Sequence, residues 1–220
     1  MLLDWIREKS FPIKAGWLER VCHRLSDNLS GDPPSRFDIA LLALAWGNIG
    51  YAAGLSYLRH VGKRAVQAEG TILECGSGAT TLLIAALTLR SGTSFVVFEH
   101  NLTWYRYMRD LLDYLGFIHV TLVYAPLIDY DDYRWYRIPK TLTVDDISLV
   151  VCDGPPGSNP GGRYGLLPTM KHRLTKDCVI LLDDTHRSAE QKIIDIWRQC
   201  RCMKASRIGR FGTHSELVFC

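Results

Sequence analysis

The chain has 220 residues, of which 47% are hydrophobic and 10% aromatic, enough for one substantial core and not obviously for two. Lys and Arg number 26 against 23 Asp and Glu, so the formal net charge of +3 is too mild to indicate a nucleic-acid-binding protein. We therefore expect one domain of catalytic size, with a small or anionic substrate left open.

Two stretches of the first sixty residues predict helices. The opening segment, MLLDWIREKSF, carries Asp4 and has no long apolar core, so it predicts a short amphipathic helix rather than a signal peptide. Residues 39–58, IALLALAWGNIGYAAGLSYL, carry no charge and reach the length of a membrane span. Glycines interrupt this run, and Arg59 and His60 continue its second half as an amphipathic face. We therefore expect two buried helices that meet at a break.

From Gly70 onward, short apolar runs alternate with helical stretches, a pattern typical of βαβ units. Most of the predicted strands are continuous apolar runs, as a parallel sheet buried on both faces requires. These strands are 71–75, 94–99, 120–124, 147–152 and 178–182. Helices are predicted at 80–89, 102–115, 166–174 and 189–201, and a terminal hairpin at 205–210 and 216–219.

The seven cysteines do not indicate a disulfide framework, because their number is odd. Cys75, Cys152 and Cys178 lie inside predicted apolar strands, where a small buried thiol is ordinary. Cys200 and Cys202 lack the spacing of zinc-binding or redox pairs. We infer a reducing, cytoplasmic setting.

Acidic residues follow four of the predicted strands. In an open parallel sheet, ligands bind at the carboxyl ends of the strands, where the strand order reverses. A single acid at such a position is also compatible with a tight strand-to-helix turn. Acids at four strand ends, all expected on one rim of the sheet, are hard to explain by turn formation alone. They are Glu74 before the glycines of ECGSG, Glu99 after the second strand, Asp153 before a Pro-Pro loop, and Asp183 with Asp184 after the fifth strand.

These segments resemble a known family, the class I S-adenosylmethionine-dependent methyltransferases, over about residues 55–220. LECGSGATT is similar to the family's motif of an acid followed by two glycines, and FVVFEHN to its ribose-binding second strand. DGPPG, with RYGLLPTM and LLDDTHRSAE, looks like the branch with a Gly-Pro-Pro-Gly loop. The resemblance implies an α/β, doubly wound, mainly parallel seven-stranded sheet with a Rossmann-like methyltransferase fold. It would carry a C-terminal antiparallel hairpin and an N-terminal helical addition.

The same resemblance implies how the chain is divided and which residues bind the cofactor. Residues 1–60 would be a helical cap of the same domain, and residues 61–220 the S-adenosylmethionine-binding catalytic domain. The glycines would let the backbone approach the methionine part, Glu99 would hold the ribose, and His100 would lie by the adenine. Asp153 would sit near the amino group and the transferring methyl. The expected cofactor-binding set is Glu74, Cys75, Gly76, Ser77, Gly78, Thr81, Glu99, His100 and Asp153.

A nicotinamide dehydrogenase is the competing enzyme interpretation. A pyrophosphate prefers a glycine fingerprint that ends in Gly, where this chain has Thr81, and we expect the charge of Glu74 to repel a diphosphate. A cationic sulfonium, in contrast, favours acidic surroundings. These two features favour the methyltransferase.

Transfer to a hydroxyl acceptor needs a base, and the candidates are Asp153, Asp184 and His186. Some metal-dependent O-methyltransferases place Asp after the fourth strand and Asp-Asn after the fifth. Asp153 and Asp184 resemble this arrangement, with Thr185 in place of the Asn, so Mg²⁺ or another divalent cation is an expected cofactor. The alternatives are that His186 merely packs and that the paired aspartates cap the last helix.

Residues 157–164 and 133–136 supply the candidate acceptor-binding side chains. Arg163 and Tyr164 follow SNPGG in a loop that we expect to cover the site as a flexible flap. Two alternatives are open for Arg163: it pairs with a carboxylate or phosphate of the acceptor, or it remains exposed to solvent. Trp135, with Tyr136, would form an aromatic wall for a planar or sugar-like acceptor or pack in the core.

We therefore expect O-methylation of a small-molecule or sugar-like hydroxyl compound in the cytoplasm. The partner would be this small acceptor, with no nucleic acid and no membrane, and the N-terminal aromatics would cover the cofactor or form a homodimer face. Two alternatives stay open: a non-catalytic cofactor-binding partner subunit, and an NAD(P)-dependent oxidoreductase.

Overall fold

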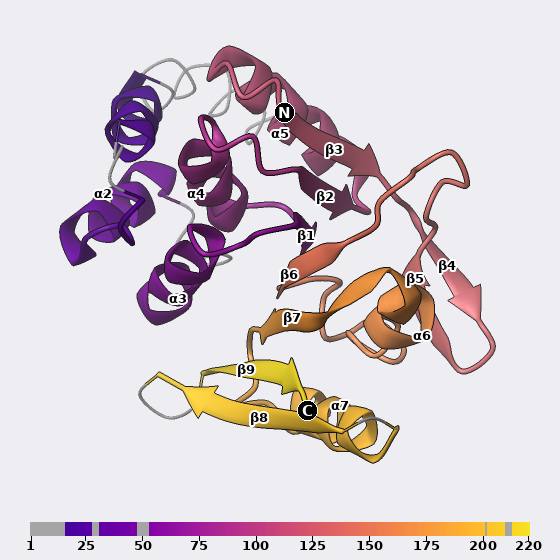
Figure 1. Ribbon diagram of the computed structural model, residues 1–220. Coiled ribbons are helices and arrows are strands. Elements are labelled where there is room, and N and C mark those ends of the chain that lie inside the picture. The colour runs from indigo at the N-terminus through magenta and orange to yellow at the C-terminus, as the bar shows by residue number, and fades with distance from the viewer. Residues whose placement is uncertain (1–15, 28–30, 48–52, 201, 210–212) are drawn as a thin grey trace.

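The computed structural model describes residues 16–27, 31–47, 53–200, 202–209 and 213–220 (Figure 1). Seven strands of this part form one sheet in the order β3-β2-β1-β6-β7-β9-β8. Their bounds are β1 Thr71–Cys75, β2 Phe95–Glu99, β3 Val120–Tyr124, β6 Ile147–Cys152, β7 Leu174–Leu182, β8 Met203–Ile208 and β9 His214–Phe219. The predicted doubly wound, seven-stranded sheet is confirmed.

The strand order indicates where a ligand site is expected. β3, β2, β1, β6 and β7 pair in parallel, while β9 runs antiparallel to both β7 and β8 and so forms the expected terminal hairpin. The chain builds outward from β1 to β3 and then returns to place β6 on the other side of β1. The reversal therefore lies between β1 and β6, where a ligand crevice is expected.

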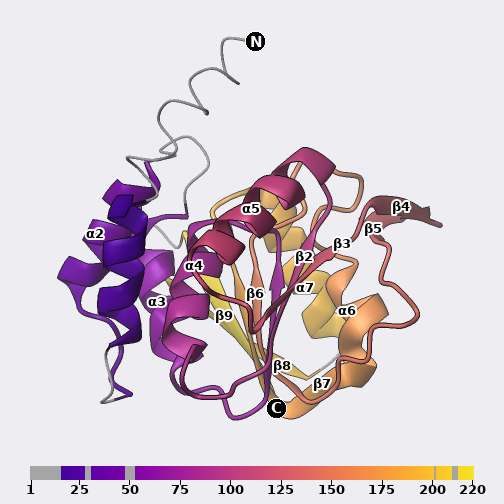
Figure 2. The same ribbon diagram turned by 90° about the horizontal axis from the view of Figure 1, so that it is seen from above.

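Helices cover both faces of the sheet (Figure 2). One core joins helix 16–26, α2 (Arg36–Trp46), α3 (Leu55–Ala65), α4 (Ala79–Thr88) and α5 (Leu102–Tyr114) to the strand side that carries Ile72. The other core joins α6 (Leu166–Met170) and α7 (Ser188–Cys200) to the side that carries Leu73. Neighbouring residues of β1 thus face opposite cores, which explains its continuous apolar run.

The uncharged run 39–58 divides between two helices, as its glycines predict. α2 begins after the N-cap Ser35, whose hydroxyl accepts from the Asp38 amide, and ends at Gly47, which has φ +67°. Residues 48–52 of the predicted break, like the predicted helix in 1–11, lie outside the described residues. None of the described helices combines the length and apolar character that crossing a bilayer requires.

Apart from shifts of one or two residues at element ends, including those of the terminal hairpin, the expected elements differ from the structure in two places. α6 ends at Met170 and a short 3₁₀ turn, Lys171–Arg173, follows, because Leu174 already pairs with Ile147 and β7 starts there rather than at 178. The second difference is an antiparallel hairpin, β4 (Leu127–Tyr130) and β5 (Tyr133–Tyr136), that sequence analysis did not predict.

Candidate functional site

The turns after β1 and β6 lie against each other. Gly76 adopts φ +87°, and a Cβ there would meet the Gly154 backbone at 3.1 Å. The amides of Asp153 and Gly154 both donate to the carbonyl oxygen of the buried Cys75, at 3.1 and 2.7 Å. A Cβ on Gly78 would instead have nothing within 4 Å. The two turns therefore pack backbone against backbone at Gly76, whereas the space around the Cβ position of Gly78 is open.

Glu74 stabilises this turn from beneath. Its fully buried carboxylate accepts hydrogen bonds from the hydroxyls of Thr80 and Thr81, and the Thr81 hydroxyl accepts from the Gly78 amide at 2.8 Å. Burial raises the pKa of Glu74 to about 8. Burial and the raised pKa reduce the charge that Glu74 would present to a diphosphate, so the expected repulsion is weaker than an exposed carboxylate would give. Glu74 and Thr81 shape the turn from inside the fold.

Glu99 lies at the end of β2 and faces the same turn. Its Oε2 accepts from the amide and hydroxyl of Ser77, at 3.1 and 2.7 Å, and its Oε1 accepts from the Asn101 amide at 2.8 Å. The His100 Nδ1 lies 3.3 Å from Oε1. Burial alone would raise the pKa of Glu99, but hydrogen bonds from His100, Asn101 and Ser77 lower it, so the group is a carboxylate.

Trp104 is a site residue that sequence analysis missed. Its Nε1 donates to the Ser77 carbonyl oxygen at 2.9 Å, and its ring packs edge-on against Trp46 of α2 at 5.9 Å. The sequence contained one signal for this position, because asparagine is a favoured residue before the first turn of a helix. The Asn101 side chain accepts from the Trp104 amide, so Trp104 lies in the first turn of α5. The contacts join α2 to the turn after β1.

Asp153 and Asp184, at the ends of β6 and β7, share one arginine. The Nη2 of Arg163 lies 3.1 Å from Asp153 Oδ1 and 2.9 Å from Asp184 Oδ2. Nη2 also donates to the Asp153 carbonyl at 2.6 Å, and Nη1 donates to the Asp183 carbonyl. Arg163 is 1% exposed. Of the two alternatives expected for Arg163, an arginine that remains exposed is wrong, because these four acceptors draw the side chain beneath the loop.

The other candidate bases differ in exposure. Asp184 adopts φ +59° and has a side chain 21% exposed, and its Oδ2 also contacts Arg187 Nη1 at 2.9 Å. Asp183 is buried, and its pKa is raised to about 7 by that burial. The His186 side chain is exposed, whereas Thr185 is buried and its hydroxyl accepts from Ser215 at 2.9 Å. The structure thus brings Asp153 and Asp184 together and leaves His186 at the surface.

The aromatic candidates lie behind the crevice. Trp135 and Tyr136 are fully buried, and a Cβ on Gly154 would meet the Tyr136 hydroxyl at 2.6 Å. Trp135 therefore packs in the core, which was the alternative to an acceptor-binding wall. Tyr164 is half-buried, and its ring packs edge-on against Tyr133 at 5.2 Å. Tyr164, unlike Trp135, retains exposed surface for an acceptor.

The expected divalent cation does not fit this arrangement. The described residues contain no group of three or more His, Cys, Asp and Glu side chains placed to hold a metal ion. Asp153 and Asp184, the two carboxylates expected to bind the ion, have the Arg163 guanidinium between them. A guanidinium there repels a metal cation and occupies one oxygen of each carboxylate that the ion would need.

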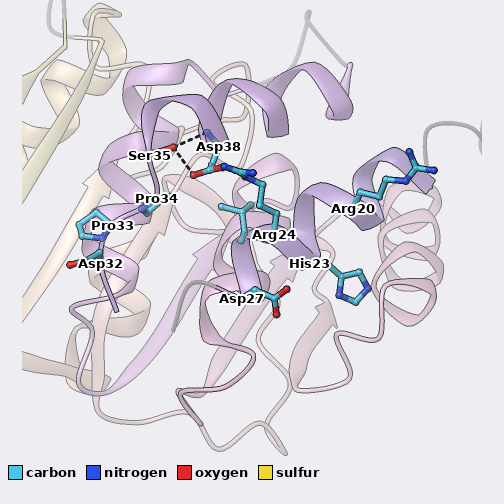
Figure 3. A pocket seen from close by; sticks show the side chains of 10 residues that line it. Arg20, His23, Arg24, Asp27, Asp32, Pro33, Pro34, Ser35 and Asp38 are labelled. Carbon is cyan, nitrogen blue, oxygen red and sulfur yellow. Dashed lines mark hydrogen bonds and ion pairs between the residues drawn. The ribbon is translucent and has the colours of Figure 1, made fainter. Parts of the chain in front are cut away.

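A pocket in the described part of the chain lies away from this rim (Figure 3). It has a volume of about 770 Å³ and lies between helix 16–26 and the start of α2. Arg20, Arg24, Asp27 and Asp38 line it, and Arg24 is paired with Asp38. None of the candidate site residues lines this pocket, so the pocket is separate from the candidate site at the rim of the sheet.

Solved structures with the same fold include methyltransferases. The SAH-bound Podospora anserina methyltransferase PaMTH1 is 15% identical, with a TM-score of 0.58 over 85% of this chain and 88% of its own. A methyltransferase from Geobacter sulfurreducens is 13% identical, with a TM-score of 0.58 over 81% and 87%. The O-methyltransferase from Bacillus cereus in complex with SAH is 12% identical, with a TM-score of 0.57 over 90% and 94%. No protein-family model or curated protein matches the chain. At these identities the likeness establishes a methyltransferase-like fold.

Proposed function

We propose that the protein is an S-adenosylmethionine-dependent methyltransferase of the branch with a DGPPG loop. The observation that carries this proposal is the joined pair of turns after β1 and β6, with Glu99 and Asp153 at the same rim. Structures of the same fold that contain SAH support it. Residues 61–220 are the catalytic part and residues 1–60 a helical cap of the same domain.

The residues present fit the cofactor. Open space at Gly78 admits a ligand to the turn, and no side chain from Gly76 obstructs it. Glu99 would bind the ribose hydroxyls, although they must compete with or replace the hydroxyl of Ser77. His100 lies beside Glu99 for the adenine. Glu74, Cys75 and Thr81 hold the turn, and bound S-adenosylmethionine would supply a methyl group on a positively charged sulfur.

For the acceptor we propose a small-molecule or sugar-like hydroxyl compound, and hence O-methylation. Partly exposed carboxylates at Asp153 and Asp184 favour a hydroxyl, whose proton one of them would take. Burial raises the pKa of Asp153 to about 6, closer to neutral than an ordinary aspartate. The exposed His186 and the half-buried Tyr164 would contact the acceptor from the outer side. One solved structure of this fold is an O-methyltransferase.

Calorimetric titration with S-adenosylmethionine, S-adenosylhomocysteine and NAD in parallel tests the proposal. We expect micromolar binding of the two adenosyl compounds and none of NAD. NAD binding would favour the oxidoreductase. Binding without turnover in a broad acceptor screen would favour a non-catalytic partner subunit.

The Glu99→Ala variant localises the binding. We expect it to weaken S-adenosylmethionine affinity about tenfold or more, or about 1.4 kcal/mol, because a ribose-binding acceptor is lost. Glu69 lies just before β1, outside the candidate site, and Glu69→Ala is the matched control, with unchanged affinity. Equal affinities in all three proteins would show that Glu99 does not bind the ribose.

A further inference from the structure

The loop of residues 154–165 is held at two places, to β5 and to the ends of β6 and β7. The Arg134 amide donates to the Pro160 carbonyl oxygen at 2.9 Å, and Asn159 Nδ2 donates to the Arg134 carbonyl at 2.8 Å. A Cβ on Gly161 would lie 2.4 Å from the Tyr133 Cβ, so this glycine permits the close approach to β5. Arg163, two residues later, is the second attachment.

Arg163 reaches the ends of both β6 and β7. Its two terminal nitrogens contact the Asp153 and Asp183 carbonyl oxygens and the Asp153 and Asp184 carboxylates. With Arg187 at Asp184, two guanidinium groups contact the Asp153 and Asp184 carboxylates. A divalent cation placed between these carboxylates would be repelled by both guanidinium groups.

We propose that the Arg163 guanidinium is the cation of this site in place of a divalent metal, and that it positions the Asp153 and Asp184 carboxylates. Arg163 contacts one oxygen of each carboxylate, and both side chains keep part of their surface exposed, 31% for Asp153 and 21% for Asp184. An arginine stays protonated in proteins, so this charge is permanent. The protein would then need no metal. The catalytic consequence rests on the proposed function, whereas the metal-binding claim does not.

The test is Mn²⁺ binding to the full chain, measured by calorimetry and by the electron paramagnetic resonance signal of free Mn²⁺, without cofactor or acceptor. The wild type is expected to bind no Mn²⁺ at this site. The Arg163→Gln variant, which keeps hydrogen-bond donors but loses the charge, is expected to gain one Mn²⁺ site that a further Asp184→Asn substitution removes.

Two matched variants keep the test decisive. Arg163→Lys retains a cation and is expected to fold and bind no Mn²⁺. Arg187→Gln removes the exposed partner of Asp184 and is expected to gain no site, because Arg163 remains in place. If Arg163→Gln does not fold, the test rests on whether the Arg163→Lys protein binds Mn²⁺.

Three results would overturn the proposal. They are a Mn²⁺ site in the wild type that Asp184→Asn abolishes, a folded Arg163→Gln protein that binds no Mn²⁺, and a Mn²⁺ site in Arg163→Lys. None of them depends on methyl transfer, so failure of the metal claim is distinguishable from failure of the proposed function. If the activity is found, we expect it to persist after exhaustive chelation.

Discussion

Glu74 is a buried acid with two hydroxyl partners, Thr80 and Thr81. Its pKa is 4.5 in an ordinary setting and about 8 in the folded chain. Between these values the folded protein keeps a proton that the unfolded chain has released. The contribution of Glu74 to stability is therefore present below pH 4.5 and is lost as the pH rises toward 8.

The Glu74→Gln variant tests this assignment. Glutamine does not titrate, so the stability of the variant relative to the wild type should improve by on the order of 3 kcal/mol from pH 4.5 to 8. Urea unfolding at four pH values in this window measures the difference. Parallel stability profiles for the two proteins would mean that Glu74 is ionised in the fold.

Individual side chains divide into those that the sequence could place and those that it could not. Glu74, Glu99 and Asp153 occupy the strand ends predicted for them, because apolar runs fix where each strand stops. The ion pairs of Arg163 depend instead on how a glycine-rich loop folds back over the sheet. No local pattern contains that information, so the sequence left open whether Arg163 pairs an acceptor or remains exposed, and its burial was not predicted.

At the scale of elements, the glycines of the two turns differ in the space available for an added side chain. Gly154 approaches Tyr136 and Gly76 closely, whereas Gly78 has φ 179° and open space at its Cβ. Alanine at 154 should therefore cost about 2 kcal/mol of unfolding free energy through overpacking. Alanine at 78 should leave stability nearly unchanged and weaken S-adenosylmethionine binding about tenfold.

Thermal unfolding and calorimetric titration of the Gly154→Ala and Gly78→Ala proteins separate these effects. Each variant is the control for the other, because both add one methyl group to the same crevice. A Gly78→Ala protein with wild-type cofactor affinity would contradict the placement of the cofactor at this turn.

The elements themselves were largely predictable. β1, β3 and β6 have the predicted bounds, because each is a short, mainly apolar run that contains Ile, Leu or Val. The hairpin β4–β5 was missed, since its strands have four residues each and its sequence, LIDYDDYRWY, mixes charges with aromatics. Tyr130 and Tyr133 are paired across this hairpin and their rings stack at 5.2 Å, which supports the register of the two strands.

At the scale of the whole molecule, the N-terminal helices are attached to the terminal hairpin. Glu216 of β9 accepts hydrogen bonds from Arg64 Nε and His60 Nε2 of α3, each at 2.7 Å, and its side chain is 15% exposed. The residues are more than 150 positions apart in sequence, so periodicity could not predict the contact. It makes α3 part of the same folding unit as the sheet.

We expect Glu216→Ala to lower the free energy of unfolding by about 2 kcal/mol, because Arg64 and His60 lose a partly buried partner. Asp27→Ala is the control, since Asp27 forms an exposed ion pair with Arg90 at 2.8 Å and should cost nothing measurable. Denaturant unfolding followed by tryptophan fluorescence gives both values. Equal stability of the two variants would mean that this attachment contributes little.

The central claim is that the paired turns after β1 and β6 bind S-adenosylmethionine. A crystal structure of the protein with S-adenosylhomocysteine tests it most directly. We expect the ligand along the turn at Gly76 and Gly78, with its ribose hydroxyls on Glu99 and its amino group near Asp153. A ligand bound elsewhere, such as the pocket beside α2, or no bound ligand at saturating concentration, would contradict the claim.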